Sequence, residues 1–249
     1  MNTVLITGCS SGFGLDAASY FLERDWTVIA TMRNPRDDLL PASDRLRILP
    51  LDVTDADSIA LGVEAAGPID VLVNNAGVGQ VSPLEGVSMA KIRELFETNT
   101  LGTIAMTQAV LPGMRAQGSG VIINVTSGVT FQPLPLMSIY TASKAAVNAF
   151  SESLALELEP FGVRVRIVIP GRSPETPFSQ NARTRSGSGV PEAYAAAAQR
   201  AFARFQQPGS SEVTYSRDVA EAVWRAATDT ACPMRLPAGA DAVARAPKA

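Results

Sequence analysis

Short apolar runs alternate along the chain with longer segments of helical periodicity. Each run is rich in Val, Ile and Leu, and the runs lie at residues 3–7, 27–31, 46–51, 71–74, 121–126 and 163–169. Strands that are apolar on both faces are typical of a parallel sheet buried between layers of helices. Helical patterns occupy residues 14–24, 55–65, 88–114 and 138–158. The alternation predicts an α/β protein with a doubly wound parallel sheet and helices on both faces.

One segment, at about residues 172–213, departs from this alternation. It contains two prolines, a Ser-Gly-Ser-Gly stretch at 186–189 and an Ala-rich helical pattern at about 191–207. One face of that helix would be apolar and would carry Tyr194, Ala198, Ala201 and Phe205. No linker or block of charge divides the chain, so we expect residues 1–249 to form one domain with 172–213 as a lid over a substrate cleft. The alternative to a lid is a surface loop with one docked helix.

Composition narrows the classes of function. Lys and Arg number 21 against 24 Asp and Glu, a balance of −3, which does not favour binding to nucleic acid. Histidine is absent, which excludes histidine bases, Ser-His-Asp triads and histidine-ligated metals. Cys9 and Cys232 predict free thiols in a reducing compartment rather than a disulfide framework or a metal site. No apolar stretch approaches the ~18 residues of a membrane helix and no targeting segment is visible, so we expect a cytoplasmic protein away from membranes.

A glycine-rich turn follows the first predicted strand. Residues 7–14 read Thr-Gly-Cys-Ser-Ser-Gly-Phe-Gly, and a helix follows. Glycines at such a turn let the backbone approach a pyrophosphate, and the helix N-terminus offers free N–H groups to that anion. The spacing is Gly-x-x-x-Gly-x-Gly, which differs from the general dinucleotide fingerprint, and a purely structural turn is the alternative.

Two side chains with acid–base chemistry fall on one face of the helix predicted at 138–158. Tyr140 and Lys144 are four residues apart, and Ser127 ends a predicted strand thirteen residues before Tyr140. An ammonium beside a phenol favours the phenolate, so we expect a lowered pKa for Tyr140. For an isolated pair, a half-buried tyrosine and a solvated lysine are the alternative.

Taken together, the motifs resemble the short-chain dehydrogenase/reductase superfamily. They occur in order along the chain: the glycine-rich turn, Asn74-Asn75-Ala76-Gly77, Asn99, Ser127, Tyr140-Thr-Ala-Ser-Lys144 and Pro170-Gly171. The resemblance covers residues 3–171, resumes near 236–241 and implies a single Rossmann-type domain. Gly79 and the stretch at 97–102 are also similar to a branch that includes steroid- and retinol-type dehydrogenases.

The resemblance implies a role for each matching residue. Tyr140 would be the general acid or base, and Lys144 would bind the nicotinamide ribose. Ser127 would bind the substrate oxygen, and Asn99 would hold a water of a proton relay through its backbone carbonyl. The remaining cofactor contacts would form four groups: at the pyrophosphate, Gly8, Ser10, Ser11, Gly12, Phe13 and Gly14; at the adenine, Asp52 and Val53; at the ribose, Asn75; and at the nicotinamide, Pro170, Gly171, Ser173 and Thr176. Each of three residues has a structural alternative: Asn99 as a polar residue whose hydrogen bonds are satisfied locally, Ser127 as a cap at the end of a strand, and Asp52 as a simple turn residue.

Cofactor choice depends on the end of the second predicted strand. Sites for NAD in this family usually carry an acidic residue there, which accepts hydrogen bonds from the ribose hydroxyls. Here Met32 is followed by Arg33, and a guanidinium binds the 2′-phosphate that a carboxylate would repel. Arg33, helped by Arg36, therefore predicts NADP(H). An unliganded surface arginine is the alternative.

These observations predict an oxidoreductase that transfers hydride between NADP(H) and a carbonyl or alcohol. The expected pocket walls are mostly apolar and favour a hydrophobic ketone, aldehyde or secondary alcohol: residues 78–80, Val129, Gln132, Leu134, Met137 and the apolar face at 194–205. A cofactor-binding sensor without chemistry and a non-dehydrogenase member of the superfamily, an enoyl reductase or a sugar-nucleotide epimerase, are the alternatives.

We also expect a homodimer or homotetramer, because relatives commonly pair through the two long helices, here 88–114 and 138–158. The second helix carries small or apolar residues away from its catalytic face, at Ala145, Ala149 and Leu156.

Overall fold

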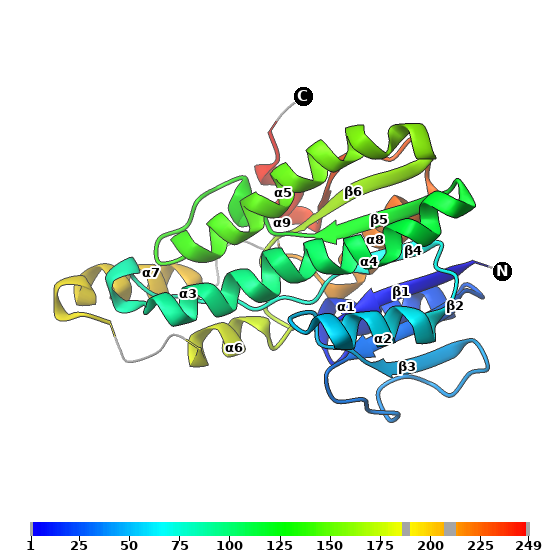
Figure 1. Ribbon diagram of the computed structural model, residues 1–249. Helices are drawn as coiled ribbons and strands as arrows, with labels where there is room; N and C mark the ends of the chain where they lie inside the picture. Colours follow the sequence, from blue (N-terminus) through cyan, green and yellow to red (C-terminus); the bar gives the residue numbers. More distant parts are fainter. Residues whose placement is uncertain (1, 186–189, 207–212, 248–249) are drawn as a thin grey trace.

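The computed structural model describes residues 2–185, 190–206 and 213–247 (Figure 1). Within these residues, a parallel sheet of seven strands runs in the order β3-β2-β1-β4-β5-β6-β7. The order reverses between β1 and β4, which is where doubly wound sheets open a crevice at the carboxyl ends of their strands. The predicted fold class is confirmed. The strands are β1 Thr3–Thr7, β2 Thr27–Met32, β3 Leu46–Pro50, β4 Val71–Asn74, β5 Gly120–Val125, β6 Val163–Pro170 and β7 Arg235–Ala238.

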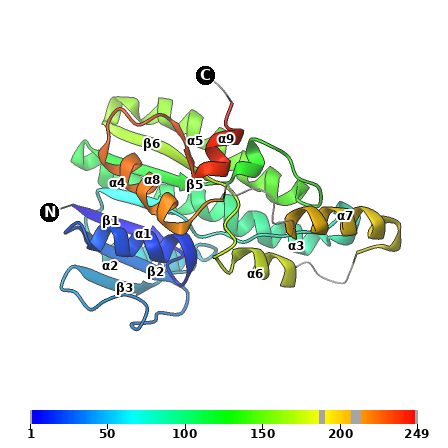
Figure 2. The same cartoon turned by 180° about the vertical axis from the view of Figure 1, so that it is seen from behind.

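Helices cover both faces of the sheet (Figures 1 and 2). Helices α1 (Gly12–Leu22) and α8 (Ser216–Thr228) pack on one face. Helices α2 (Ala56–Ala66), α4 (Gly102–Gln117) and α5 (Ser138–Leu158) pack on the other. None of the helices in the described part of the chain is long and apolar enough to span a membrane.

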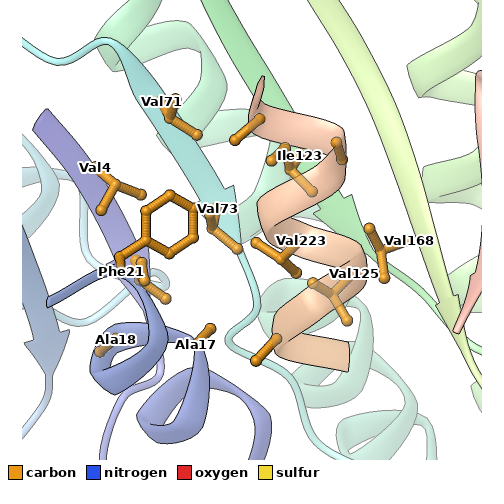
Figure 3. Packing of buried hydrophobic residues seen from close by; sticks show 14 of the residues in the cluster. Val4, Ala17, Ala18, Phe21, Val71, Val73, Ile123, Val125, Val168 and Val223 are labelled. Atoms are coloured by element: carbon orange, nitrogen blue, oxygen red, sulfur yellow. The ribbon is translucent and has the colours of Figure 1, made fainter. Parts of the chain in front are cut away.

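Each strand contributes to two cores, because successive side chains point to opposite faces of the sheet. Val4 and Ile6 belong to the core under α1 and α8, whereas Leu5 belongs to the core under α2, α4 and α5. Figure 3 shows the first of these cores, where Phe21 of α1 and Val223 of α8 meet the valines of the sheet. Burial on both faces explains why the strands read as continuous apolar runs.

The long helix predicted at 88–114 is divided in the structure. Helix α3 (Met89–Phe96) passes into a π-helical turn, Glu97–Leu101, before α4 begins. A Cβ atom on Gly102 would lie 2.8 Å from a methyl group of Val53 and 2.9 Å from its carbonyl oxygen. Gly102 therefore lets α4 approach the loop after β3 at the point where the turn widens, and such turns are frequent at functional sites.

The departing segment at 172–213 carries two helices, α6 (Phe178–Thr184) and α7 (Ala195–Gln206). Both lie at the same end of the molecule as α3 (Figures 1 and 2). Ala198 and Ala201 are buried, as the predicted apolar face requires. Residues 186–189 and 207–212 and the side chain of Phe205 lie outside the described part of the chain.

Candidate active site

A single large cavity, about 1980 Å³ in volume, lies at the carboxyl ends of the strands. Its walls come from the residues that follow β1, β2, β3, β4, β5 and β6, with further walls from α3 and α6. Of the residues predicted for the site, all but Gly14 and Asn99 line this cavity. The sequence motifs therefore meet at one place in the fold, although they are spread from residue 8 to residue 176.

The glycine-rich turn after β1 is tightly constrained. Gly8 and Gly12 have positive φ angles, +76° and +59°, which favour glycine. A Cβ atom on Gly14 would lie 2.5 Å from the Gly8 carbonyl oxygen and would also overlap the side-chain amide of Asn75. That amide donates to the carbonyl oxygens of Thr7, at 2.9 Å, and Gly8, at 3.2 Å. Asn75, predicted beside the ribose, thus lines the cavity while its amide holds the turn in shape.

The N-terminus of α1 faces this turn. Ser11 is the N-cap residue, has an extended backbone and makes no side-chain hydrogen bond to the helix, and the first turn carries no acidic residue. Because Ser10, Ser11, Gly12 and Phe13 all line the cavity, the first N–H groups of α1 lie beside it. A helix N-terminus with uncapped donors and no carboxylate is suited to a phosphate group.

Beyond the turn, the cavity is bordered by Met32, Arg33, Asp52 and Val53. Arg33 is exposed. Arg36 does not line the cavity and instead binds Asp38, with its shorter contact at 2.7 Å. Its predicted assistance to Arg33 is therefore not supported, because its guanidinium is committed to a neighbouring carboxylate. One oxygen of Asp52 accepts from the N–H of Thr54 at 2.9 Å and from its hydroxyl at 2.8 Å, which closes the turn that the sequence offered as an alternative.

The tyrosine is buried in an apolar cluster at the other end of the cavity. Tyr140 is only 4% exposed and packs with Leu95 and Val129, and its ring centroid lies 5.7 Å from that of Phe178. Burial raises the pKa of Tyr140 to about 12, and a hydrogen bond with the Ser127 side chain opposes this rise. The expected lowering of this pKa is therefore wrong for this structure, because desolvation of the phenolate outweighs the hydrogen bond.

The lysine lies one helical turn from Tyr140 and is also buried. Burial lowers the pKa of Lys144 to about 8, and Nζ donates to the carbonyl oxygen of Val125 at 3.0 Å. A Cβ atom on Gly77 would lie 3.3 Å from both Nζ of Lys144 and Oδ1 of Asn99. Glycine at this position therefore allows the lysine and the asparagine to flank the backbone that follows β4.

Asn99 lies in the π-helical turn and is fully buried. Its Oδ1 accepts from the N–H of Val78 at 2.8 Å, and its Nδ2 donates to the carbonyl oxygen of Val78 at 2.9 Å and to Oγ of Ser143 at 3.1 Å. Its own carbonyl accepts from the Thr103 hydroxyl at 3.0 Å. The side chain therefore bonds to residues 21 and 44 positions away and joins three segments around the site, whereas the local bond from Thr103 is to the backbone carbonyl.

The floor of the cavity beyond β6 depends on a buried aspartate that the sequence analysis missed. Asp241, in α9 (Ala240–Arg245), is 2% exposed. Its carboxylate accepts from the backbone N–H of Arg172 at 2.8 Å and from the hydroxyl of Thr214 at 2.7 Å. The Thr214 oxygen in turn accepts from the N–H of Gly171 at 2.9 Å. The motif near 236–241 was the available signal, but nothing in its pattern revealed this contact.

Two polar atoms beside the floor have no hydrogen-bond partner within the described residues. They are the hydroxyl oxygens of Thr126 and Ser173, both buried in side chains that line the cavity. Buried hydroxyl groups are usually hydrogen-bonded, so these two are suited to a polar ligand group. Together with the glycine turn and the α1 N-terminus, they fit a nicotinamide dinucleotide, and Ser173 and Thr176 would hold its polar carboxamide.

Apolar side chains line the cavity around Tyr140, whereas α3 and α6 add polar and charged walls, among them Arg93, Glu94, Gln180 and Asn181. The expected walls Val78, Gly79, Val129, Gln132, Leu134 and Met137 all border the cavity, and Val81, Phe178 and Ala182 join them. Of the expected apolar face at 194–205, Ala201 borders the cavity, but Tyr194 and Ala198 do not. Gln80 is buried but does not line the cavity, contrary to expectation.

A Rossmann-type sheet, a glycine turn after β1 and a buried tyrosine–lysine pair at one cavity define the class of nicotinamide-dependent oxidoreductases. Residues 2–187 match the family described as short chain dehydrogenase, and the chain belongs to that family.

Known proteins of this family resemble the chain to different extents. It is 45% identical over 178 residues to the uncharacterized oxidoreductase YusZ of Bacillus subtilis (strain 168), covering 67% of this chain and 63% of that protein. It is 39% identical over 180 residues to human retinol dehydrogenase 8, covering 68% of this chain and 58% of that protein. A short-chain dehydrogenase from Streptomyces avermitilis has a similar structure, with a TM-score of 0.85 at 36% identity, over 98% of this chain and 91% of the other. The matches therefore span less than two thirds of the length of these two curated relatives.

Proposed function

We propose that this protein transfers hydride between NADP(H) and the carbonyl or alcohol group of a hydrophobic small molecule. The observation that carries the proposal is that Ser127, Tyr140 and Lys144 line the same cavity as the glycine turn. A carbonyl oxygen between Ser127 and Tyr140 would receive two hydroxyl donors, as reduction of that carbonyl requires.

The cofactor would lie along the carboxyl edge of the sheet. The α1 N-terminus and the turn at 8–14 would bind the pyrophosphate, Asp52 and Val53 would border the adenine, and residues 170–176 would border the nicotinamide. When bound, this group supplies or accepts the hydride. An exposed Arg33 beside a buried Met32, with no acidic side chain at the end of β2, supports a phosphate-bearing ribose.

The proton would be handled by Tyr140. With a pKa of about 12 its hydroxyl is protonated at neutral pH, which suits donation to a substrate oxygen in the direction of reduction. Ser127 would donate a hydrogen bond to the same oxygen as negative charge develops there. Lys144 would bind ribose hydroxyls and favour the phenolate after the proton has left, and the Asn99 carbonyl would hold the relay water.

The substrate would be hydrophobic, since the walls of the cavity around Tyr140 are apolar side chains. Retinol dehydrogenase 8, by its name, acts on an apolar alcohol, and its similarity to this chain supports the same class. Segment 172–213 would serve as the lid, since Phe178 packs on Tyr140 and Arg185 lies 3.8 Å from Glu94 of α3.

A panel of hydrophobic ketones and aldehydes, followed by loss of NADPH absorbance, tests the proposal. Tyr140→Phe is expected to keep cofactor affinity and to reduce kcat by about 10²–10⁴-fold, because it removes the acid and retains the ring. Tyr20→Phe is the matched control, since Tyr20 packs against Arg24 and Trp224, away from the cavity. Binding of NADPH without turnover of any carbonyl would favour the sensor, and turnover of Tyr140→Phe at the parent rate would overturn the role of this hydroxyl.

A further inference from the structure

We propose that Ser143 is a positioning residue of the active site, whose hydroxyl joins the Asn99 side chain to the helical turn that carries Tyr140. The inference rests on the proposed function, because it assigns Ser143 an effect on turnover. Ser143 does not line the cavity and cannot act on a substrate directly.

The hydroxyl of Ser143 makes two hydrogen bonds of defined direction. Ser143 is fully buried in α5, between Tyr140 and Lys144. Its Oγ donates to the carbonyl oxygen of Tyr140 at 2.8 Å and accepts from Nδ2 of Asn99 at 3.1 Å. A hydroxyl has one proton, so donation to Tyr140 leaves only acceptor capacity for Asn99. The amide group of Asn99 must therefore face Ser143 with its nitrogen.

A third hydrogen bond joins the same two segments. The hydroxyl of Thr100, the next residue in the π-helical turn, donates to the backbone carbonyl of Ser143 at 3.1 Å. Side chain and main chain of Ser143 are thus both bound by the turn at Glu97–Leu101. This coupling holds the turn against the part of α5 that carries the acid–base pair.

Asn99 transmits the constraint to the cavity wall. With Nδ2 directed toward Ser143 and the carbonyl of Val78, its Oδ1 faces the N–H of Val78. The adjacent Gly77 lies between Asn99 and Lys144, and both Gly77 and Val78 line the cavity. Loss of the Ser143 acceptor would therefore loosen the wall beside the lysine, although no group that touches a ligand has been removed.

The chain offers a matched control two helical turns away. Ser151 is also fully buried in α5, donates to the carbonyl oxygen of Val147 at 2.6 Å and accepts from Nδ2 of Asn124 at 2.7 Å. Neither Ser151 nor Asn124 lines the cavity. Ser151→Ala thus removes the same kind of hydroxyl from the same helix without touching the connection to Asn99.

The test compares Ser143→Ala with Ser151→Ala in the full chain. Both variants should lose similar stability to denaturant. Ser143→Ala alone should lower kcat for a carbonyl by about tenfold, with KM and the Kd for NADPH changed less than twofold, because a misplacement of ~1 Å costs up to about 10²-fold in rate. Amide hydrogen exchange at Val78 should also be faster in Ser143→Ala than in the control.

The outcomes separate this inference from the function on which it rests. If the wild type reduces carbonyls and the two variants keep equal kcat values, Ser143 has no positioning role. If the wild type reduces no carbonyl, the proposed function fails, and hydrogen exchange then decides whether Ser143 positions Asn99. Equal exchange at Val78 in the two variants overturns the inference, and faster exchange in Ser143→Ala alone upholds its structural part.

Discussion

Replacement of the buried lysine should change how the stability of the cofactor-free protein depends on pH. Lys144 is 5% exposed, and burial lowers its pKa from 10.5 to about 8. Between these two values the unfolded chain binds a proton that the folded protein does not, so stability rises with pH. At 1.36 kcal/mol per pKa unit, integration from pH 7 to pH 10 gives a gain of about 2.5 kcal/mol. Tyr140 acts in the opposite sense only above pH 10, since its pKa is raised from 10.0 to about 12.

Lys144→Met should remove this gain, because methionine fills a similar space without a titrating group. Near pH 7 the variant loses the hydrogen bond to Val125 but also loses the cost of a buried charge, so the test lies in how the difference between the two proteins changes with pH. Urea unfolding can be followed through Trp26 and Trp224, whose rings pack on Phe21 with centroids 5.0 and 5.1 Å away.

The free energy of unfolding of the wild type minus that of Lys144→Met should rise by about 2.5 kcal/mol between pH 7 and pH 10. Lys91→Met is the control, since Lys91 is exposed and pairs with Glu94 at the surface. Parallel curves for wild type and Lys144→Met across this range would refute the assignment of the linked proton to Lys144.

Three further expectations concern the cofactor and the assembly. Gly14→Ala should weaken NADPH binding by at least about tenfold in a fluorescence titration, because its methyl group overlaps Asn75 and the turn must shift; unchanged affinity would show that the turn does not bind the cofactor. Wild type should prefer NADPH over NADH by at least about tenfold in kcat/KM, and Met32→Asp with Arg33→Ala should reverse the preference; equal use of both cofactors by the wild type would count against Arg33. Light scattering should find a dimer or tetramer that Leu156→Arg dissociates, since Leu156 is 75% exposed on α5; a wild-type mass of 26.2 kDa would contradict the predicted pairing.

The apolar pattern predicts most of the sheet because burial on two faces leaves a signal in every residue of a strand. The six predicted strands agree with the structure to within one residue at every end. The seventh strand was not predicted, because it contains Pro237 and an exposed Arg235 and is defined by its pairing with β6. Helix α8 was not predicted either, since its buried face consists largely of alanine and gives a weak apolar pattern.

The candidate site could be predicted where a motif combines residue type with spacing, as at Tyr140 and Lys144. Three features depended on contacts that residue type and spacing do not specify. The π-helical turn at Asn99 lies where Gly102 approaches Val53, and the raised pKa of Tyr140 comes from its burial. From the sequence, Arg36 is a candidate phosphate contact, but in the structure it pairs with Asp38. Such properties belong to the environment of a side chain and leave no local pattern.

The carboxylate of Asp241 has a consequence for the order in which the protein is made. It binds the backbone of a residue synthesised 69 positions earlier, so the loop after β6 gains its support late in translation. Domains generally fold as units during synthesis, with N-terminal parts emerging first. A nascent chain that ends before Asp241 can contain the glycine turn, the tyrosine and the lysine and still lack the floor beside Ser173. We therefore expect nucleotide binding to stabilise the nascent chain fully only after residue 241 has emerged and α9 has docked.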